Sequence, residues 1–319
     1  NVNMVGGHVV RNVYGGGNIA SVGIADEPDP APGEDYKTGL ASVTITGGTV
    51  GTIHEDENYG NVFGSGHGGV GGEYVNLAFV KNTHVTIGGG ANTRVFGSVF
   101  GGGEDGPVRM NTLVDIEGGI IGDEDDVANE PLDGNVYGGG RGLLATVESE
   151  TAGEVRGHTT VNIRKSTDGV TEYSPIVWNN VYGGGSQSVV KKYKVVNMSG
   201  GLVHGSMFGG SREIPASRPN VAPRWVNMWG GTVEGNVYGC SYFAEDGDPA
   251  HDEDWASFVN ISGGTIGTNA NGGIEGGNVY GAGYGGKVKG SVAVLIGKNA
   301  IVETSKEGGE FNEINIHRQ

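Results

Sequence analysis

The stretch GGTVEGNVYG, residues 230–239, is the clearest copy of a segment that recurs along the whole chain. Every copy combines glycines with an aliphatic residue followed directly by an aromatic one. Successive aromatic residues lie about 26 to 49 residues apart, close to the spacing of repeat proteins whose units stack on one another. The rings that mark the copies are Tyr14, Phe63, Phe100, Tyr137, Tyr182, Phe208, Tyr238 and Tyr280.

A second recurring element, Val-x-Ile or Val-x-Met, precedes each aromatic segment. Its alternation of apolar and polar residues is typical of a β-strand with one buried face. A glycine pair usually follows, then Thr-Val or Thr-Ile, and then the closing aliphatic-aromatic segment. Three short strands separated by glycine corners would make one turn of a parallel β-helix. We therefore predict an all-β, single-stranded, right-handed parallel β-helix (solenoid) of about eight to nine coils with variable loop insertions.

Glycine supplies 65 of the 319 residues, roughly three times its usual share. Sharp corners need a positive φ, which costs little only for glycine. Neighbouring strands also stack about 4.8 Å apart, which leaves little room for side chains at a bend. The glycines therefore have a structural cause, and we do not expect a phosphate-binding loop because no helix pattern follows any glycine-rich run.

The chain has 37 acidic and 20 basic residues and a formal charge of -17. This balance argues against nucleic acid and anionic membranes, which need basic patches, so we expect neutral or cationic partners. Cys240 is the only cysteine, which excludes an intrachain disulfide. No apolar run is long enough for a transmembrane helix. Because the chain begins inside a repeat unit, we expect that a signal peptide was removed.

The units VNISGG at 259–264 and GNVYGGG at 134–140 resemble the glycine-rich NVYGGG-type repeats of large surface proteins of gut bacteria of the Bacteroidetes group. The resemblance covers nearly the whole chain, from Val2 to about Gly286. It implies a β-helical, adhesin-like protein that is secreted or on the cell surface, and it carries over no catalytic residues. We expect one repeat domain over 1–286, with 287–319 as its final coil and C-terminal cap. The segment IRKSTDGV at 163–170 replaces a glycine corner and predicts a local distortion.

The column of aromatic rings is one candidate binding surface. Adjacent strand residues face opposite ways, so rings next to inward aliphatic residues would point outward and offer a platform for sugars or proteins. Alternatively, a bend buries the rings as a ladder in the core. We favour burial, because Phe replaces Tyr at three of the eight positions and the hydroxyl is therefore dispensable.

The polar residue in each Val-x-Ile segment forms a second column. Stacked amides hydrogen-bond along such a column and stabilise it, and amides together with aromatic rings also suit carbohydrate recognition. The column comprises Asn3, Thr44, Thr86, Asp115, Asn162, Asn197, Asn227 and Asn260, of which the last four are the candidate binding amides. A further set precedes the closing segments: Asn12, Asn61, Asn135, Asn180, Asn236 and Asn278.

Acidic insertions occur at 25–36, 54–60, 123–134 and 244–255. Clustered carboxylate oxygens favour Ca²⁺ over softer metals, and we expect no other cofactor. The candidate calcium ligands are Asp246, Asp248, Asp252 and Asp254, or Asp123, Asp125 and Asp126.

These observations favour a non-catalytic structural or adhesin-like module that binds glycans or partner proteins. The alternative is a carbohydrate-active enzyme, either a polysaccharide lyase or a glycoside hydrolase, with a groove built from loops. Hydrolysis needs two facing carboxylates, and Asp115 is the only acid in the outward polar column. The sequence therefore leaves enzymatic activity undecided but favours a non-catalytic protein.

Overall fold

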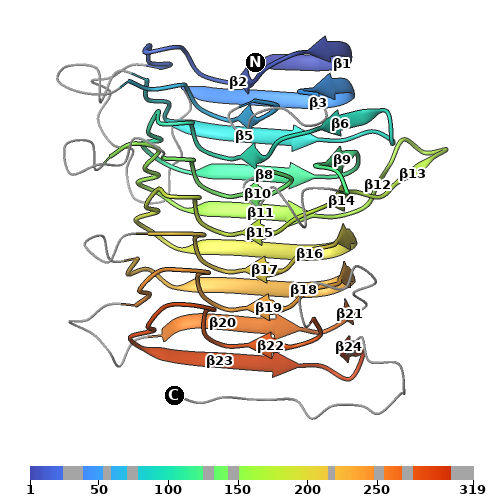
Figure 1. Ribbon diagram of the computed structural model, residues 1–319, viewed down its shortest axis with the longest axis vertical. Coiled ribbons are helices and arrows are strands. Elements are labelled where there is room, and N and C mark those ends of the chain that lie inside the picture. The colour runs from blue at the N-terminus through green and yellow to red at the C-terminus, as the bar shows by residue number, and fades with distance from the viewer. Residues whose placement is uncertain are drawn as a thin grey trace.

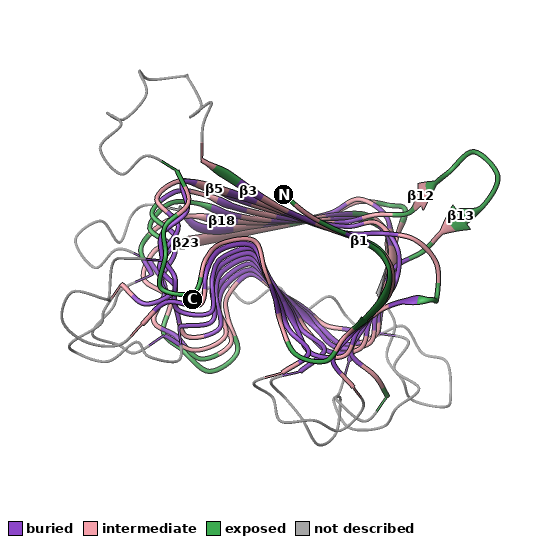
Figure 2. Cartoon of the chain, turned by 90° about the horizontal axis from the view of Figure 1, so that it is seen from above, coloured by how far each residue is buried: buried purple, intermediate pink, exposed green. Residues whose placement is uncertain are grey.

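The computed structural model describes residues 1–23, 39–52, 59–69, 78–124, 133–142, 151–214, 220–247, 255–267 and 276–302. Its strands lie in parallel layers that follow one another from the N-terminal to the C-terminal end of the stack (Figure 1). Seen along the stack, successive layers follow nearly the same outline (Figure 2). Among the described residues, no helix has the length and apolar character that crossing a bilayer requires.

The main ladder contains one strand from each layer, paired in parallel with the strands above and below. Its register places the Val-x-Ile segments on one another: Val43 pairs with Val85, Val85 with Val114, and Val114 with Val161. The strands are β1 (Val2–Val9), β3 (Leu40–Val50), β5 (Asn82–Ile87), β8 (Thr112–Ile116), β11 (Thr159–Ile163), β16 (Lys194–Val203), β18 (Arg224–Val233), β20 (Trp255–Ile261) and β23 (Ser291–Ile296).

Shorter strands complete each layer beyond the corner of the main ladder. One group is β6 (Thr93–Val95), β9 (Ile120–Ile121), β14 (Ile176–Val177), β21 (Gly264–Ile266) and β24 (Ala300–Val302). The closing segments form a separate parallel sheet of β2 (Val13–Tyr14), β4 (Val62–Phe63), β7 (Val99–Phe100), β10 (Val136–Tyr137), β15 (Val181–Tyr182), β17 (Met207–Phe208), β19 (Val237–Tyr238) and β22 (Val279–Tyr280).

The prediction of a solenoid with three separate short strands in each coil of a single-stranded β-helix is wrong. Strands β3 and β16 run through the glycine corner without a break. Each therefore pairs with two separate strands of one adjacent layer: β3 pairs with β5 and β6, and β16 pairs with β11 and β14. Eight parallel strands consequently pair in a closed circuit, in the order β3, β5, β8, β11, β16, β14, β9 and β6. The all-β chain thus contains a closed eight-stranded parallel arrangement within its larger sheet, plus the separate sheet of closing segments.

The physical reason lies in the corner glycines. Gly48 in β3 and Gly201 in β16 have φ of +87° and +93°, a conformation that glycine adopts without the strain of a Cβ. The chain therefore turns while it keeps its interstrand hydrogen bonds, as at a β-bulge. The glycines after each aromatic residue have another cause: a Cβ on Gly138 would overlap the carbonyl oxygen of Gly183 in the next layer.

Two hydrophobic clusters lie on the two sides of the closing sheet. The aliphatic residue of each closing segment joins a core built mainly from the Val-x-Ile residues. The aromatic residue packs on the opposite side in a separate cluster of rings. Both faces of these two-residue strands are therefore covered, which the alternation of residues alone did not indicate.

The predicted distortion at 163–170 is confirmed. Strands β12 (Ser166–Thr167) and β13 (Glu172–Tyr173) form an antiparallel hairpin there, the only antiparallel pair among the described strands. Toward the C-terminus, β23 pairs with β20 and β24 with β21, so residues 291–302 continue the larger sheet. The rest of the predicted cap, 303–319, lies outside the described residues.

Candidate functional site

The aromatic column is buried. Its rings could bind a ligand only if they were exposed, so the column is not a binding surface. Phe63, Phe100, Tyr137, Tyr182, Phe208 and Tyr238 are each at most 6% exposed, and only the end members Tyr14 and Tyr280 are half-buried. Consecutive rings stack with centroids 4.6–5.1 Å apart and nearly parallel planes. The rings therefore form the core ladder that we favoured, and they stabilise the stack.

The amide column, in contrast, lies on the outward face of the main ladder. The Nδ2 atom of Asn227 donates to Oδ1 of Asn197 across 3.0 Å, and Asn197 donates to Asn162 across 2.9 Å. Asn162 donates in turn to Oδ1 of Asp115 across 2.9 Å. The predicted hydrogen-bonded ladder is present in these layers, and all its donors point toward the N-terminal end.

The ladder stops at its C-terminal end. Asn260 pairs with Asn227 in the strand register, but no side-chain hydrogen bond joins these two residues, both of which the structure describes. The Oδ1 atom of Asn227 is thus not used by the ladder, and the half-buried Asn260 continues the outward column. An acceptor and a complete amide group are therefore available side by side on this face.

A row of rings runs beside the amide ladder. His158 stacks on Tyr193 with centroids 3.4 Å apart, Tyr193 meets Trp225 edge-on at 5.7 Å, and Trp225 stacks on Phe258 at 5.5 Å. Tyr193 is exposed, whereas Trp225 and Phe258 are half-buried. We call this set the ring row; it crosses the layers of β11, β16, β18 and β20, the same layers as Asn162, Asn197, Asn227 and Asn260.

A second tryptophan stands on the other side of the ladder. Within β18, Trp225, Asn227 and Trp229 alternate with the buried Arg224, Val226 and Met228. Trp229 is 51% exposed. Asn227, whose Oδ1 the ladder does not use, therefore lies between two outward tryptophans, and we call the ring row, these four amides and Trp229 the outer strip.

Sequence reasoning found the amides of the outer strip but missed its rings. The signal was present in WVNMW at 225–229, where period-2 alternation puts both tryptophans and the asparagine on one face. Tyr193 and His158 could not be found in this way, because they lie just before their strands and meet only when layers stack.

A charged group terminates the ladder at Asp115. His84 Nε2 lies 2.7 Å from Oδ2 of Asp115, and Arg164 bridges Asp115 and Glu117 at 3.1 and 2.5 Å. Burial raises the pKa of Asp115, but hydrogen bonds from His84 and Asn162 and the nearby positive charges outweigh burial, so its pKa lies below the ordinary value. Asp115 is a carboxylate at neutral pH and is not available as a proton donor.

The second set of asparagines has a structural role. Their side-chain oxygens accept backbone N–H groups of the adjacent layer: Asn12 accepts from Asn61, Asn61 from Ser98, and Asn135 from Asn180. The same pattern continues with Asn180 and Ser206, and with Asn236 and Asn278. These bonds link the segments that enter the closing strands.

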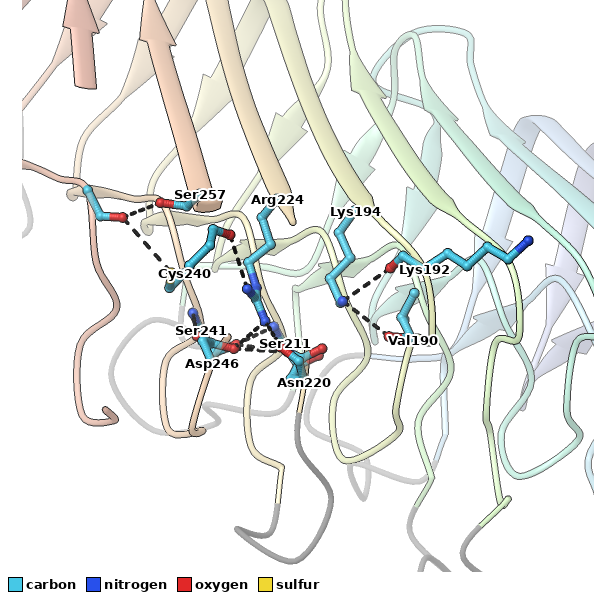
Figure 3. Close-up of polar contacts among 12 residues, drawn as sticks. Val190, Lys192, Lys194, Ser211, Asn220, Arg224, Cys240, Ser241, Asp246 and Ser257 are labelled. Carbon is cyan, nitrogen blue, oxygen red and sulfur yellow. Dashed lines mark hydrogen bonds and ion pairs between the residues drawn. The ribbon is translucent and has the colours of Figure 1, made fainter. Parts of the chain in front are cut away.

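The structure removes Asp246 from the candidate calcium ligands. Asp246 is 1% exposed and accepts from Arg224 Nη2 at 2.6 Å and from Ser241 N at 2.7 Å, deep inside the stack (Figure 3). Oδ1 accepts from Arg224, Asn220 and Ser241 Oγ, and Oδ2 accepts from Ser241 N, so both oxygens of this buried carboxylate are engaged within the protein rather than free for a loop-bound ion. Asp123 is half-buried, while Asp125, Asp126, Asp248, Asp252 and Asp254 lie outside the described residues.

Lys194 and Arg224 occupy an inward column that holds Thr83, Thr112 and Thr159 in earlier layers. The threonine hydroxyls donate to the carbonyls of Gly101, Gly138 and Gly183. Lys194 Nζ instead donates to the carbonyls of Val190 and Lys192 at 3.1 and 3.3 Å, and burial lowers its pKa well below the ordinary value. Burial also raises the pKa of the neighbouring Cys240 to about 12, so this cysteine is an unreactive thiol.

Another titratable cluster lies around Glu104 on the side of the buried rings. Tyr14 Oη donates to Glu104, Arg141 pairs with Glu104 at 2.5 Å, and His67 Nε2 lies 3.5 Å from it. Burial and the Glu104 carboxylate raise the pKa of Tyr14, so the phenol stays protonated and cannot act as a base.

Comparison of the chain with protein-family models, with curated proteins and with solved structures finds no match.

Proposed function

We propose that this protein is a non-catalytic, exported surface module that binds a polysaccharide along the outer strip. The observation that carries the proposal is the placement of Asn227, with an Oδ1 that the ladder leaves unused, between the outward side chains of Trp225 and Trp229. A sugar ring has an apolar face that stacks on an aromatic ring and hydroxyl groups that bond amides. The outer strip offers both kinds of group in adjacent columns.

The length of the strip supports a polymer rather than a single sugar. Ring contacts run without interruption from His158 to Phe258, and amides accompany them in four successive layers. Neighbouring strands are spaced about 4.8 Å apart, so four layers extend over about 14 Å. Several sugar units can contact such a surface at the same time.

The enzyme alternative has less support. Asp115 and Glu117 are two carboxylates on the same part of the outward face, but Arg164 bridges them. A hydrolase needs one protonated carboxyl group, whereas Asp115 has a lowered pKa. Tyr14, the phenol next to His67 and Arg141, is held in its protonated form.

Native affinity electrophoresis against a panel of soluble polysaccharides tests the proposal. We expect one class of polymer to retard the protein without becoming shorter. Trp225→Ala should raise the dissociation constant for the polymer about tenfold or more, because it removes the central stacking surface. Tyr284→Ala is the matched control, since Tyr284 is an exposed aromatic residue outside the strip. Equal losses in both variants, or a shortened polymer, would overturn the proposal.

A further inference from the structure

Basic side chains gather at one edge of the outer strip, although the chain as a whole carries a charge of -17. The segments that lead into β8, β11 and β16 pair through Val108, Val155 and Val190. These valines are buried in a small cluster of their own. The residues that follow them are Arg109, Arg156 and Lys191, and Lys192 comes next in the last segment. We call these four residues the basic edge.

The basic edge has a local excess of positive charge. Arg156 and Lys191 share one carboxylate, that of Glu154, at 3.2 Å each, and their side chains are still 48% and 53% exposed. Arg109 lies over the ring of Phe79. Lys192 is exposed and has no ion-pair partner among the described residues. Arg156, Lys191 and Lys192 are therefore three positive charges beside the one carboxylate of Glu154.

The basic edge adjoins the ring row directly. Arg156 is two residues before His158, and Lys192 is the neighbour of Tyr193. Burial, and after it the charge of Lys192, lower the pKa of His158. Figure 3 shows Lys192 pointing away from the buried Lys194, with which it shares a chain segment. A ligand on His158, Tyr193 and Trp225 would therefore lie beside the exposed ammonium and guanidinium groups.

We propose that the polysaccharide bound by the outer strip is acidic, and that its carboxylate or sulfate groups contact Lys191, Lys192 and Arg156. This inference rests on the proposed function and names its ligand class. The net charge led us to expect neutral or cationic partners, but a distant negative charge is screened within about 8–10 Å at physiological salt. The groups that touch a ligand decide its charge preference, and here they are basic.

The test compares matched pairs of polymers that differ in charge but share a backbone. Dextran and dextran sulfate test the effect of sulfate groups on binding. Hydroxyethylcellulose and carboxymethylcellulose test the effect of carboxylate groups. We expect one acidic polymer or both to bind more tightly than the neutral partner, with an advantage that decreases as sodium chloride is added. The double substitution Lys191→Gln and Lys192→Gln should weaken binding of the acidic polymer by about two- to twentyfold. Lys287→Gln, at an exposed lysine outside the basic edge, should leave binding unchanged.

The outcomes separate this inference from the proposed function. If acidic and neutral polymers bind equally and the double substitution has no effect, the acidic ligand is excluded while glycan binding stands. If no polysaccharide binds, both proposals fail. Retention of single-stranded DNA or of vesicles with anionic lipid, as tight as that of the acidic polymers, would also overturn the inference. Trp225→Ala should weaken binding of every polymer, whereas the lysine substitutions should remove only the advantage of the acidic ones.

Discussion

Asn162 donates a hydrogen bond of 2.9 Å to Asp115 and so joins the neutral amide ladder to the charged group formed by Asp115, His84 and Arg164. The ladder is therefore polarised: its last acceptor is a carboxylate, and each amide orients the next. At the opposite end lies Asn227, whose Oδ1 atom the ladder does not use and which stands between Trp225 and Trp229 along β18. The orientation of the amide at the proposed binding position is thus fixed by a carboxylate three layers away.

Asp115→Asn should destabilise the protein in a pH-dependent way. The folded pKa of Asp115 is lowered, so its contribution to stability is complete above the unfolded value of about 4 and is lost as pH falls through the lower folded value. The partners are partly exposed, so we expect a loss of about 1 kcal/mol at pH 7. Urea unfolding of the parent protein and the variant, at pH 7 and at the lowest pH where both remain folded, measures this difference in unfolding free energy. A difference that stays the same in acid would contradict this assignment.

Lys194→Met should stabilise the protein, most strongly at low and neutral pH. Because burial lowers the folded pKa of Lys194 below 10.5, the unfolded state binds more protons between the two values. The stability of the parent protein therefore rises with pH in that window, and the gain from the methionine shrinks to nothing as pH passes the unfolded value. We expect a gain of about 1–3 kcal/mol at pH 7. Thermal unfolding between pH 7 and 10 measures the gain in stability, with Lys287→Met, at an exposed lysine, as the control. A gain that did not change with pH would show that the lowered pKa of Lys194 is not its cause.

Asp246→Ala should destabilise the protein whether or not calcium is present. The substitution leaves the guanidinium of Arg224, which is 0% exposed, without its carboxylate partner. Breaking a buried ion pair from one side costs about 3–5 kcal/mol. Denaturant unfolding with calcium and with a chelator is the measurement, and Glu172→Ala serves as a control at an exposed acid outside both sets of candidate calcium ligands. If the loss appeared only with calcium, Asp246 would be a metal ligand after all.

Phe100→Ala should cost about 3–5 kcal/mol, because it opens a cavity in the middle of the ring ladder. Phe100 is 2% exposed and stacks on Phe63 and Tyr137 at 4.8 and 4.7 Å. Tyr182→Phe keeps the ring and should change stability by less than about 1 kcal/mol. Chemical denaturation of the two variants provides the comparison. If they lost similar amounts, hydroxyl groups rather than stacked rings would hold this column together.

Much of the local structure follows from the sequence alone. The alternation in each Val-x-Ile segment correctly assigned the buried and outward residues of β5, β11 and β16, and substitution of Phe for Tyr correctly indicated a buried ring ladder. The glycine pairs marked the corners because positive φ requires glycine there. These features depend on neighbours a few residues apart along the chain.

Only the tertiary structure decided how the strands connect and where the functional groups meet. Whether a glycine corner interrupts a strand depends on hydrogen bonds to other layers, so the closed circuit through β3 and β16 was not visible in the repeats. Asp246 looked like a loop acid until packing placed Arg224 beside it. The row from His158 to Phe258 joins residues 100 positions apart, because stacking brings equivalent positions of unequal repeats into contact. Period-2 alternation states which way a side chain points, but not what covers that face.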